Sequence, residues 1–332
     1  MQAESVVARI PLPQEDAKSR YRELCMAESG IPLFDRDWWL DAVCGGSDGW
    51  EVLLVERGGE IVASMPYCKR KKSLFQVISM PQLTLTMGVW IRYPEGSGTA
   101  DKLAWEREIY SELIDRLPRV DYFNQQFHGD NTNWSVFYWR GFRQMSRFTY
   151  MIEDTSDVER VYSGFSEQVK ADIRKAKGLL RVVESGDLDR FQEVNRTMFD
   201  PPHFTMPYDY EVLQAVDRAC NERGLRQILF AEDAQGRALC ALYVVRDARC
   251  TYYLLGGDTP QAKASGGHAL LVWHAIQDAA RRGQPFDFHG GMHEPIERIY
   301  RSFGAAQKSY YQISKVSGRL FKLAYYMKQA LR

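Results

Sequence analysis

Apolar and polar side chains alternate most clearly near the end of the chain, at Phe286, Asp287, Phe288 and His289. This period of two predicts a strand whose phenylalanines face a core, while the acid and the imidazole share the opposite face. Two glycines follow and let a ligand approach the backbone closely. The pattern therefore predicts an acid–imidazole pair at the edge of a cleft. Taken singly, Asp287 also fits a structural turn acid and His289 a surface histidine.

A series of elements occurs twice along the chain. The first copy has strands at 50–56, 61–67 and 74–78, with a basic turn at 69–72, then a Gly/Pro segment, a helix at 102–117, a strand at 120–128 and an aromatic–basic–Gly–Phe cluster at 138–144. The second has strands at 227–232, 238–245 and 250–255, a Gly-rich segment, a helix at 268–281, the strand at 286–289 and a similar cluster at 300–304. We predict an α/β (α+β) fold made of two mixed sheets flanked by helices, with domains 1–150 and 151–315.

Composition narrows the class of protein. The 332 residues are 45% hydrophobic and 26% charged, with no run long enough to span a membrane and no signal-peptide pattern, so we expect a soluble cytoplasmic protein. The six cysteines are scattered, which indicates buried thiols and neither disulfides nor a zinc site. The 43 basic and 43 acidic residues balance, which argues against general nucleic-acid binding but leaves room for local basic patches.

Two segments between the copies are candidates for ligand contact. The predicted helix at 158–180 carries Lys170, Arg174 and Lys177 on one face, with Arg181 continuing the spacing. Such a stripe fits either a solvated face or a phosphate contact. The segment 199–208, which contains His203 and Tyr208, is rich in proline and aromatic residues and is typical of a loop packed over a pocket.

The C-terminal segment 316–332 predicts a basic helix with several apolar side chains. We expect Leu320, Phe321 and Leu323 to pack against the first domain. Exposure of all three on one helix face would instead favour peripheral contact with a membrane surface.

Several motifs together carry a family resemblance. They are the basic stretch from Ser166 to Lys177, Gly256-Gly257-Asp258-Thr259-Pro260, Ser265-Gly266-Gly267-His268, the 286–290 strand, and Tyr300-Arg301-Ser302-Phe303-Gly304. Their order resembles the FemAB-like branch of the GNAT acyltransferases, most clearly from about Glu153 to Gln312. The resemblance implies a tandem GNAT fold and acyl transfer. Three departures leave the donor open: Arg301 stands where tRNA-dependent members usually carry lysine, residues 180–199 hold no long helical hairpin, and 261–267 is a weakened pyrophosphate loop.

The resemblance and the chemistry of acyl transfer suggest roles for these residues. His289 or Asp287 is the candidate general base, and the backbone near Gly256 and Gly257 is the candidate oxyanion site. The helix start at Ser265, Gly266, Gly267 and His268 suits a pyrophosphate or a tRNA phosphate. The candidate acceptor-binding residues are Arg298, Arg301, Tyr208, Tyr253, Tyr300, His203, Lys170 and Arg174, and each tyrosine also fits a core position. His289 and His293 are four apart, but the glycines between them argue against a helical metal pair, and we predict no metal site.

We therefore expect an N-acyltransferase that moves an acyl or aminoacyl group from acyl-CoA or aminoacyl-tRNA to an amine. The acceptor is a cell-envelope or polysaccharide precursor or a small amino metabolite. No cofactor is expected to be tightly bound, and the chain fits a monomer or a dimer. The alternative is a tandem GNAT protein that has lost catalysis and binds a glycan or a protein partner. Asp287, His289 and the glycine-rich helix start favour the enzyme.

Overall fold

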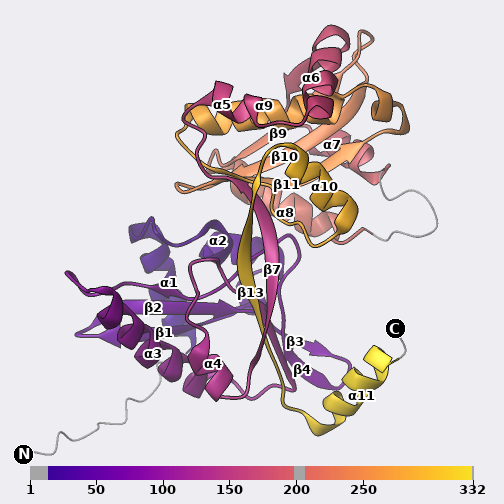
Figure 1. Ribbon diagram of the computed structural model, residues 1–332. Coiled ribbons are helices and arrows are strands. Elements are labelled where there is room, and N and C mark those ends of the chain that lie inside the picture. Colours follow the sequence, from indigo (N-terminus) through magenta and orange to yellow (C-terminus); the bar gives the residue numbers. More distant parts are fainter. Residues whose placement is uncertain (1–13, 198–205, 331–332) are drawn as a thin grey trace, which may run out of the picture.

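The computed structural model describes residues 14–197 and 206–330. Two groups of helices and strands lie one above the other in Figure 1, and the long strands β7 and β13 run side by side between them. Among the described residues, no helix has the length and hydrophobicity that crossing a membrane requires.

The helices lie where apolar residues recur at helical spacing. They are α1 (Gln14–Ala27), α2 (Asp37–Cys44), α3 (Thr99–Arg116), α4 (Ser135–Trp139), α5 (Val158–Ser163), α6 (Glu167–Leu179), α7 (Leu188–Arg196), α8 (Tyr210–Asn221), α9 (Gly267–Arg281), α10 (Glu294–Ser302) and α11 (Arg319–Ala330), with short 3-10 turns at Leu33–Asp35, Ser47–Gly49 and Pro260–Ala264. The predicted helix at 158–180 is interrupted by Gly164, and the Ser166 hydroxyl caps α6 by accepting from the Val169 N–H.

The strands form two sheets. The smaller has the order β1-β2-β5, from β1 (Glu51–Arg57), β2 (Glu60–Tyr67) and β5 (Trp90–Ile91). The larger has the order β3-β4-β6-β13-β7-β12-β11-β10-β9-β8, from β3 (Lys69–Lys72), β4 (Phe75–Ile78), β6 (Tyr122–Gln126), β7 (Arg143–Ile152), β8 (Arg181–Glu184), β9 (Arg226–Glu232), β10 (Ala238–Arg246), β11 (Thr251–Asp258), β12 (Phe286–Asp287) and β13 (Ala306–Val316).

The two halves exchange their last strands. In the second half the parallel pair β11–β12 is completed by β7, which comes from the end of the first half. In the first half the parallel pair β4–β6 is completed by β13, which comes after the second half. Strands β7 and β13 then pair with each other over nine positions, from Ala306–Met151 to Ser314–Arg143. The predicted boundary between residues 150 and 151 lies inside β7, so neither half completes its strand set from its own segment.

Two predictions about strands are wrong. The basic segment 69–72 is not a turn: it forms β3, and the reversal lies at Ser73 and Leu74. The first meander is therefore divided between the two sheets. The strand at 286–289 is shorter than predicted, because His289 adopts a left-handed backbone conformation with φ of 57°. Consequently, Asp287 and His289 do not share a strand face.

Helices cover both faces of the second-half sheet. On one face, α6 and α9 bury Ile173, Leu271 and Ile276 against β9 and β10. On the other face, α7 and α8 bury Phe191 and Leu213, and the N-terminal segment adds Phe34 and Trp39 from the first half. Strand β10 is apolar from Cys240 to Val245 because it is buried on both faces. The second core cluster therefore joins the two halves.

The C-terminal helix returns to the first half, as predicted, but only part of its apolar surface is covered. Phe321 stacks on Tyr122 of β6 at 5.2 Å between ring centroids and meets Phe75 of β4 edge-on at 5.0 Å. Leu320 and Leu323 remain exposed. The expectation that all three side chains pack against the first half is therefore wrong for the two leucines.

Candidate active site

A cavity of about 230 Å³ lies where the two halves meet. The first half contributes Phe34, Thr86 and His128 to its wall, and the second half contributes Tyr252 and Asp287. Further charged groups at the wall are Asp130, Arg249 and Lys308. Arg249 donates to Asp130 across the junction at 2.7 Å, and Lys308 pairs with Glu153. The cavity is therefore lined by both acids and bases from both halves.

Asp287 is a buried carboxylic acid in the wall of this cavity. Its side chain is 7% exposed, and its Oδ1 accepts from the Thr149 hydroxyl and from the His289 backbone N–H, the latter at 2.8 Å. The Gly290 N–H donates to Thr149 Oγ1 at 3.0 Å and fixes that hydroxyl. Burial raises the Asp287 pKa to about 6, although both hydrogen bonds oppose the rise. Among the described residues Oδ2 accepts no hydrogen bond, so it is the oxygen left for a ligand.

The His289 side chain packs among aromatic rings and does not lie beside the Asp287 carboxylate. Its ring stacks on Phe34 at 4.9 Å between centroids and meets Tyr252 edge-on at 6.3 Å. Its Nε2 is shielded from solvent and has no hydrogen-bond partner among the described residues. Burial lowers the His289 pKa to about 3. A histidine with so low a pKa accepts a proton poorly, so of the two predicted bases the geometry favours Asp287.

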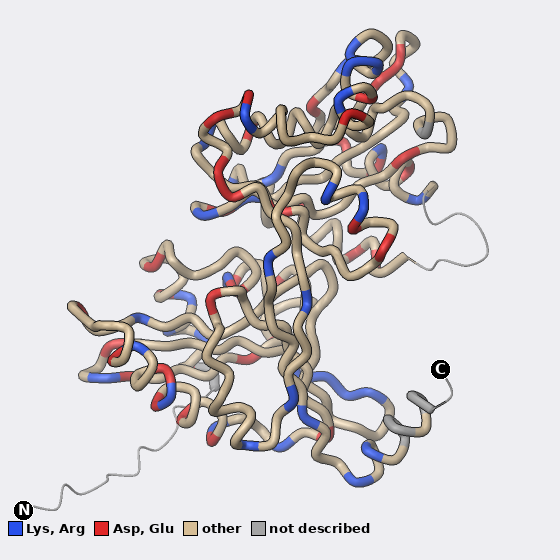
Figure 2. The backbone as a smooth tube through the Cα atoms, viewed as in Figure 1, with Lys and Arg blue, Asp and Glu red and all other residues tan. Residues whose placement is uncertain are grey.

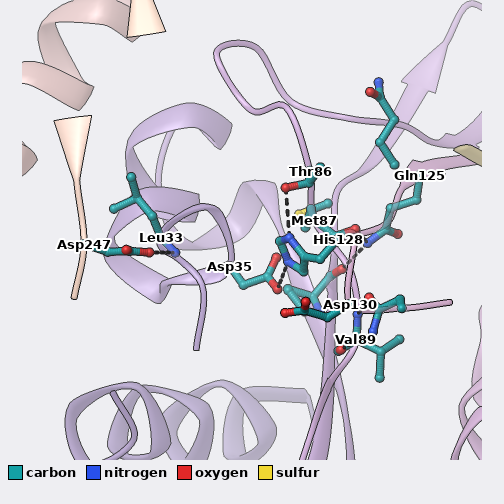
Figure 3. Close-up of polar contacts among 12 residues, drawn as sticks. Leu33, Asp35, Thr86, Met87, Val89, Gln125, His128, Asp130 and Asp247 are labelled. Carbon is teal, nitrogen blue, oxygen red and sulfur yellow. Dashed lines mark hydrogen bonds and ion pairs between the residues drawn. The ribbon is translucent and has the colours of Figure 1, made fainter. Parts of the chain in front are cut away.

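A chain of three polar side chains, which the sequence analysis missed, lies in the first half (Figure 3), and two of them, Thr86 and His128, line the cavity. His128 Nδ1 lies 2.8 Å from Thr86 Oγ1, and His128 Nε2 lies 2.7 Å from Asp35 Oδ2. Asp35 is fully buried, and its Oδ1 has no hydrogen-bond partner in the described part of the chain. The sequence signal was weak because Asp35 and His128 are 93 positions apart.

Strands β11 and β12 separate at the cavity. They pair only at Thr251–Phe286 and Tyr252–Asp287, so Asp287 is the last paired residue of β12. From Tyr253 to Asp258, β11 pairs with β10 alone. The free edge includes Gly256 and Gly257, and their role as an oxyanion site stays a prediction. A Cβ on Gly257 would lie 2.6 Å from the Asn195 Cα of α7, so that glycine is also required for packing.

Side chains behind β11 fix its backbone. Asn195 of α7 donates to the Gly256 carbonyl, and the Tyr208 hydroxyl donates to the Asn195 side-chain oxygen. Tyr208 is buried in the core shared by the two halves. The prediction that Tyr208 lines an acceptor pocket is therefore wrong, because its hydroxyl supports the strand from behind.

Tyr253, His268 and Tyr300 form a group on the other face of the sheet from Tyr252. His268 Nε2 lies 3.3 Å from the Tyr253 hydroxyl, and His268 Nδ1 lies 3.0 Å from Asp258 Oδ1. Burial opposes the charged form of both His268 and Asp258, but their mutual attraction raises the His268 pKa and lowers the Asp258 pKa. Burial also raises the pKa of Tyr300, whose ring packs 6.0 Å from that of Tyr253.

The start of α9 is closely packed. A Cβ on Gly266 would lie 2.3 Å from the Asp172 carbonyl oxygen of α6, and a Cβ on Gly267 would lie 2.7 Å from Cys240 Sγ. The Ser265 hydroxyl accepts from the Gly267 N–H at 3.1 Å. Packing against α6 thus explains Gly266 and packing against β10 explains Gly267, and contact of both with a donor phosphate stays a prediction.

The predicted acceptor residues of α6 and α10 do not line the cavity. Lys170 bonds to the Ser163 carbonyl and to Glu167, and Arg174 is exposed on α6. Arg298 pairs with Glu294, and Arg301 pairs with Glu297 along α10. His203 lies outside the described residues. The structure therefore brings Asp287 together with groups of the first half and not with the predicted arginines.

Comparisons with known proteins follow this geometry. Residues 163–295 match the family model described as an acetyltransferase (GNAT) domain. They include β11, β12 and the start of α9. The match therefore assigns a GNAT acetyltransferase-type domain to the second half of the chain, from within α5 to the start of α10.

The whole chain has the fold of FemX, which confirms the FemAB-like resemblance at the level of the fold. The FemX crystal structure aligns with a TM-score of 0.70 at 12% identity, over 92% of this chain and 98% of that one. The C-terminal domain of a putative lysylphosphatidylglycerol synthetase from Agrobacterium fabrum aligns with a TM-score of 0.54 at 12% identity, over 96% and 97% of the two chains. L-PGS from Bacillus licheniformis gives 0.52 at 10% identity, over 94% and 95%. A search of curated sequences gave no significant match.

Proposed function

We propose that the protein transfers an acyl group from an acyl-CoA to an amine that binds in the cavity between the halves, with Asp287 as the general base. The observation that carries the proposal is the position of Asp287, which is both the last paired residue of β12 and part of the cavity wall. A donor at the separated strands and an acceptor in the cavity would meet at this carboxylate.

The free edge of β11 suits the donor. Backbone N–H and C=O groups along an unpaired strand edge pair with an extended chain of amides, and the CoA arm carries two amides before its thioester. An aminoacyl-tRNA, the alternative donor, offers no such arm to the strand. The backbone near Gly256 and Gly257 is then the candidate site for the oxyanion of the tetrahedral intermediate.

The cavity suits a primary amine. Asp287 Oδ2 accepts a proton from the ammonium form, and the neutral amine nitrogen attacks the thioester carbonyl. Collapse of the tetrahedral intermediate breaks the carbon–sulfur bond, and the second nitrogen proton passes to the departing sulfur, so that the amide and the CoA thiol are released. A base whose pKa is about 6 is largely ionised at neutral pH and still accepts a proton. A volume of about 230 Å³ admits a small amino metabolite or the amino end of a larger cell-envelope or polysaccharide precursor.

Thermal shift with acetyl-CoA and with CoA tests donor binding, and release of free thiol in the presence of amines of increasing size tests transfer. Asp287→Asn keeps an oxygen for Thr149 and the His289 N–H, so we expect unchanged stabilisation by the donor but a turnover about 100- to 10,000-fold lower. Asp48→Asn, an exposed acid of the first half, is the control and should retain full turnover.

Full turnover by Asp287→Asn would remove Asp287 as the base. Stabilisation by acetyl-CoA without transfer to any amine would favour the binding-module alternative. A lack of stabilisation by both acetyl-CoA and CoA, with stabilisation by aminoacyl-tRNA, would assign the other donor class.

A further inference from the structure

A second surface of the molecule combines exposed cations with exposed apolar side chains. It lies on the first half, away from the cavity, where β3 and α11 meet. We call it the β3–α11 face: residues 69–72, Leu74, Arg319, Leu320, Lys322, Leu323 and Met327. All four residues of β3, Lys69–Lys72, are exposed basic side chains, and Arg319 and Lys322 of α11 are exposed as well. Figure 2 shows this concentration of basic residues along the β3–β4 hairpin and the base of α11.

The apolar part of this face is large for a protein surface. Leu74 is 85% exposed at the tip of the β3–β4 hairpin. On α11, Leu320, Leu323 and Met327 are 75%, 63% and 58% exposed. Their spacing of three and four puts them on one side of the helix. Clustered apolar side chains of this size mark an interaction surface, unlike single exposed leucines.

The two elements are held together, so the residues act as one face. Phe321 projects from α11 between Tyr122 and Phe75, and Phe75 follows Leu74 directly in the chain. The side of α11 that carries Phe321 thus docks on the protein, while the side with Leu320, Leu323 and Met327 is left uncovered.

The charged side chains of the β3–α11 face are all basic. Neither 69–78 nor 315–332 contains an Asp or Glu, although the whole chain has 43 acids and 43 bases. Asp121, an acid in contact with this region, is engaged by the Gln76 N–H at 2.9 Å. Lysines on an edge strand also discourage pairing with another chain. That role does not account for Leu74 or for the apolar row on α11.

We propose that the β3–α11 face binds the surface of an anionic membrane, with the leucines and Met327 entering the interface and the basic side chains meeting lipid phosphates. An amphipathic basic helix binds membranes in this way, and basic residues near the surface add to the attraction. A second copy of this chain fits less well, because a two-fold interface would place the two basic strands against each other. A nucleic acid would engage the cations but leave the apolar row exposed.

Flotation with lipid vesicles tests the proposal on the full chain, without donor or acceptor, so its result is independent of the acyl-transfer proposal. We expect binding to vesicles of phosphatidylcholine with phosphatidylglycerol, little binding to phosphatidylcholine alone, and weakening as salt increases. Lys69→Glu with Lys71→Glu should weaken binding about fivefold or more per residue. Leu320→Ser with Leu323→Ser should weaken it at unchanged charge.

A matched control uses a comparable basic region of the second half. Lys175→Glu, Lys177→Glu and Leu179→Ser alter exposed residues of α6 and should leave vesicle binding unchanged. Circular dichroism melts confirm that each variant is folded. The proposal is overturned if the wild type does not float with anionic vesicles, or if the α6 control loses binding equally. It is also overturned if the leucine variant floats like the wild type. Tighter binding of RNA than of vesicles, through the lysines alone, would assign the face to a nucleic acid. Loss of self-association instead of flotation in the leucine variant would assign the face to a second copy of this chain.

Discussion

His128 Nε2 lies 2.7 Å from Asp35 Oδ2, and this carboxylate is fully buried at the junction between the two halves. A buried carboxylate is costly unless it is paired and hydrogen-bonded. The imidazole supplies that partner, and the Tyr21 hydroxyl donates to the Asp35 carbonyl from a third element at 2.7 Å. The pair therefore anchors the segment that carries Phe34 against β6 and against the cavity.

Removing one side chain of the Asp35–His128 pair should lower the free energy of unfolding more than removing both. We expect His128→Ala to lower the free energy of unfolding by about 3 kcal/mol, because Asp35 loses its partner while staying buried. The double variant with Asp35→Ala should be more stable than the sum of the single changes predicts, with a coupling energy of about 1 to 3 kcal/mol. Urea unfolding of the four proteins measures this, and additive effects would show that the two side chains are not coupled.

Ionisation of Asp287 should oppose folding. Its folded pKa of about 6 exceeds the value of 3.8 expected for a free aspartate, so the folded chain binds more protons than the unfolded chain between these pH values. This contribution therefore makes stability fall as pH rises from about 4 to 6, by about 3 kcal/mol in all. Asp287→Asn removes the contribution. Above pH 7 we expect the variant to be more stable than the wild type, and near pH 3.5 we expect little difference.

Urea unfolding at a series of pH values measures the Asp287 effect. Asp48→Asn is again the control and should follow the wild-type curve, since Asp48 is exposed. An unchanged difference between Asp287→Asn and wild type at all pH values would show that Asp287 does not titrate in this range in the folded protein.

Gly257 provides a test of the packing between β11 and α7, and Gly178 of α6 serves for comparison. Gly257→Ala places a methyl group 2.6 Å from the Asn195 Cα and 2.8 Å from its N, and both are backbone atoms of α7 that cannot turn aside. We expect a loss of about 2 kcal/mol or more together with weaker donor stabilisation. Gly178→Ala, in α6 with nothing within 4 Å of the added methyl, should instead gain about 0.5 to 1 kcal/mol.

Thermal unfolding with and without acetyl-CoA distinguishes the two glycine variants. Equal stability of Gly257→Ala and wild type would mean that α7 and β11 are less closely packed than the structure shows.

The local pattern of apolar and polar residues was sufficient to predict most of the helices and strands. The helix at 268–281 and the strands at 227–232 and 238–245 lie within a residue of α9, β9 and β10, because period and turn residues are encoded nearby in the chain. The sequence also placed Asp287 on a short strand followed by two glycines, since such a pattern can be recognised locally. Its role as a catalytic residue stays a prediction. The pattern was misleading at His289, where the left-handed backbone interrupts the alternation.

Tertiary structure decided what the local pattern could not express. The sequence determined two mixed α/β units, but the exchange of β7 and β13 depends on pairing between residues up to 171 positions apart, as at Arg143 and Ser314. Likewise, Asp35 meets His128 only because two distant segments cross at the junction of the halves. The proton affinity of Asp287 depends on burial by Thr149 and the cavity wall, and burial is a property of the folded chain rather than of the alternation that first marked this residue.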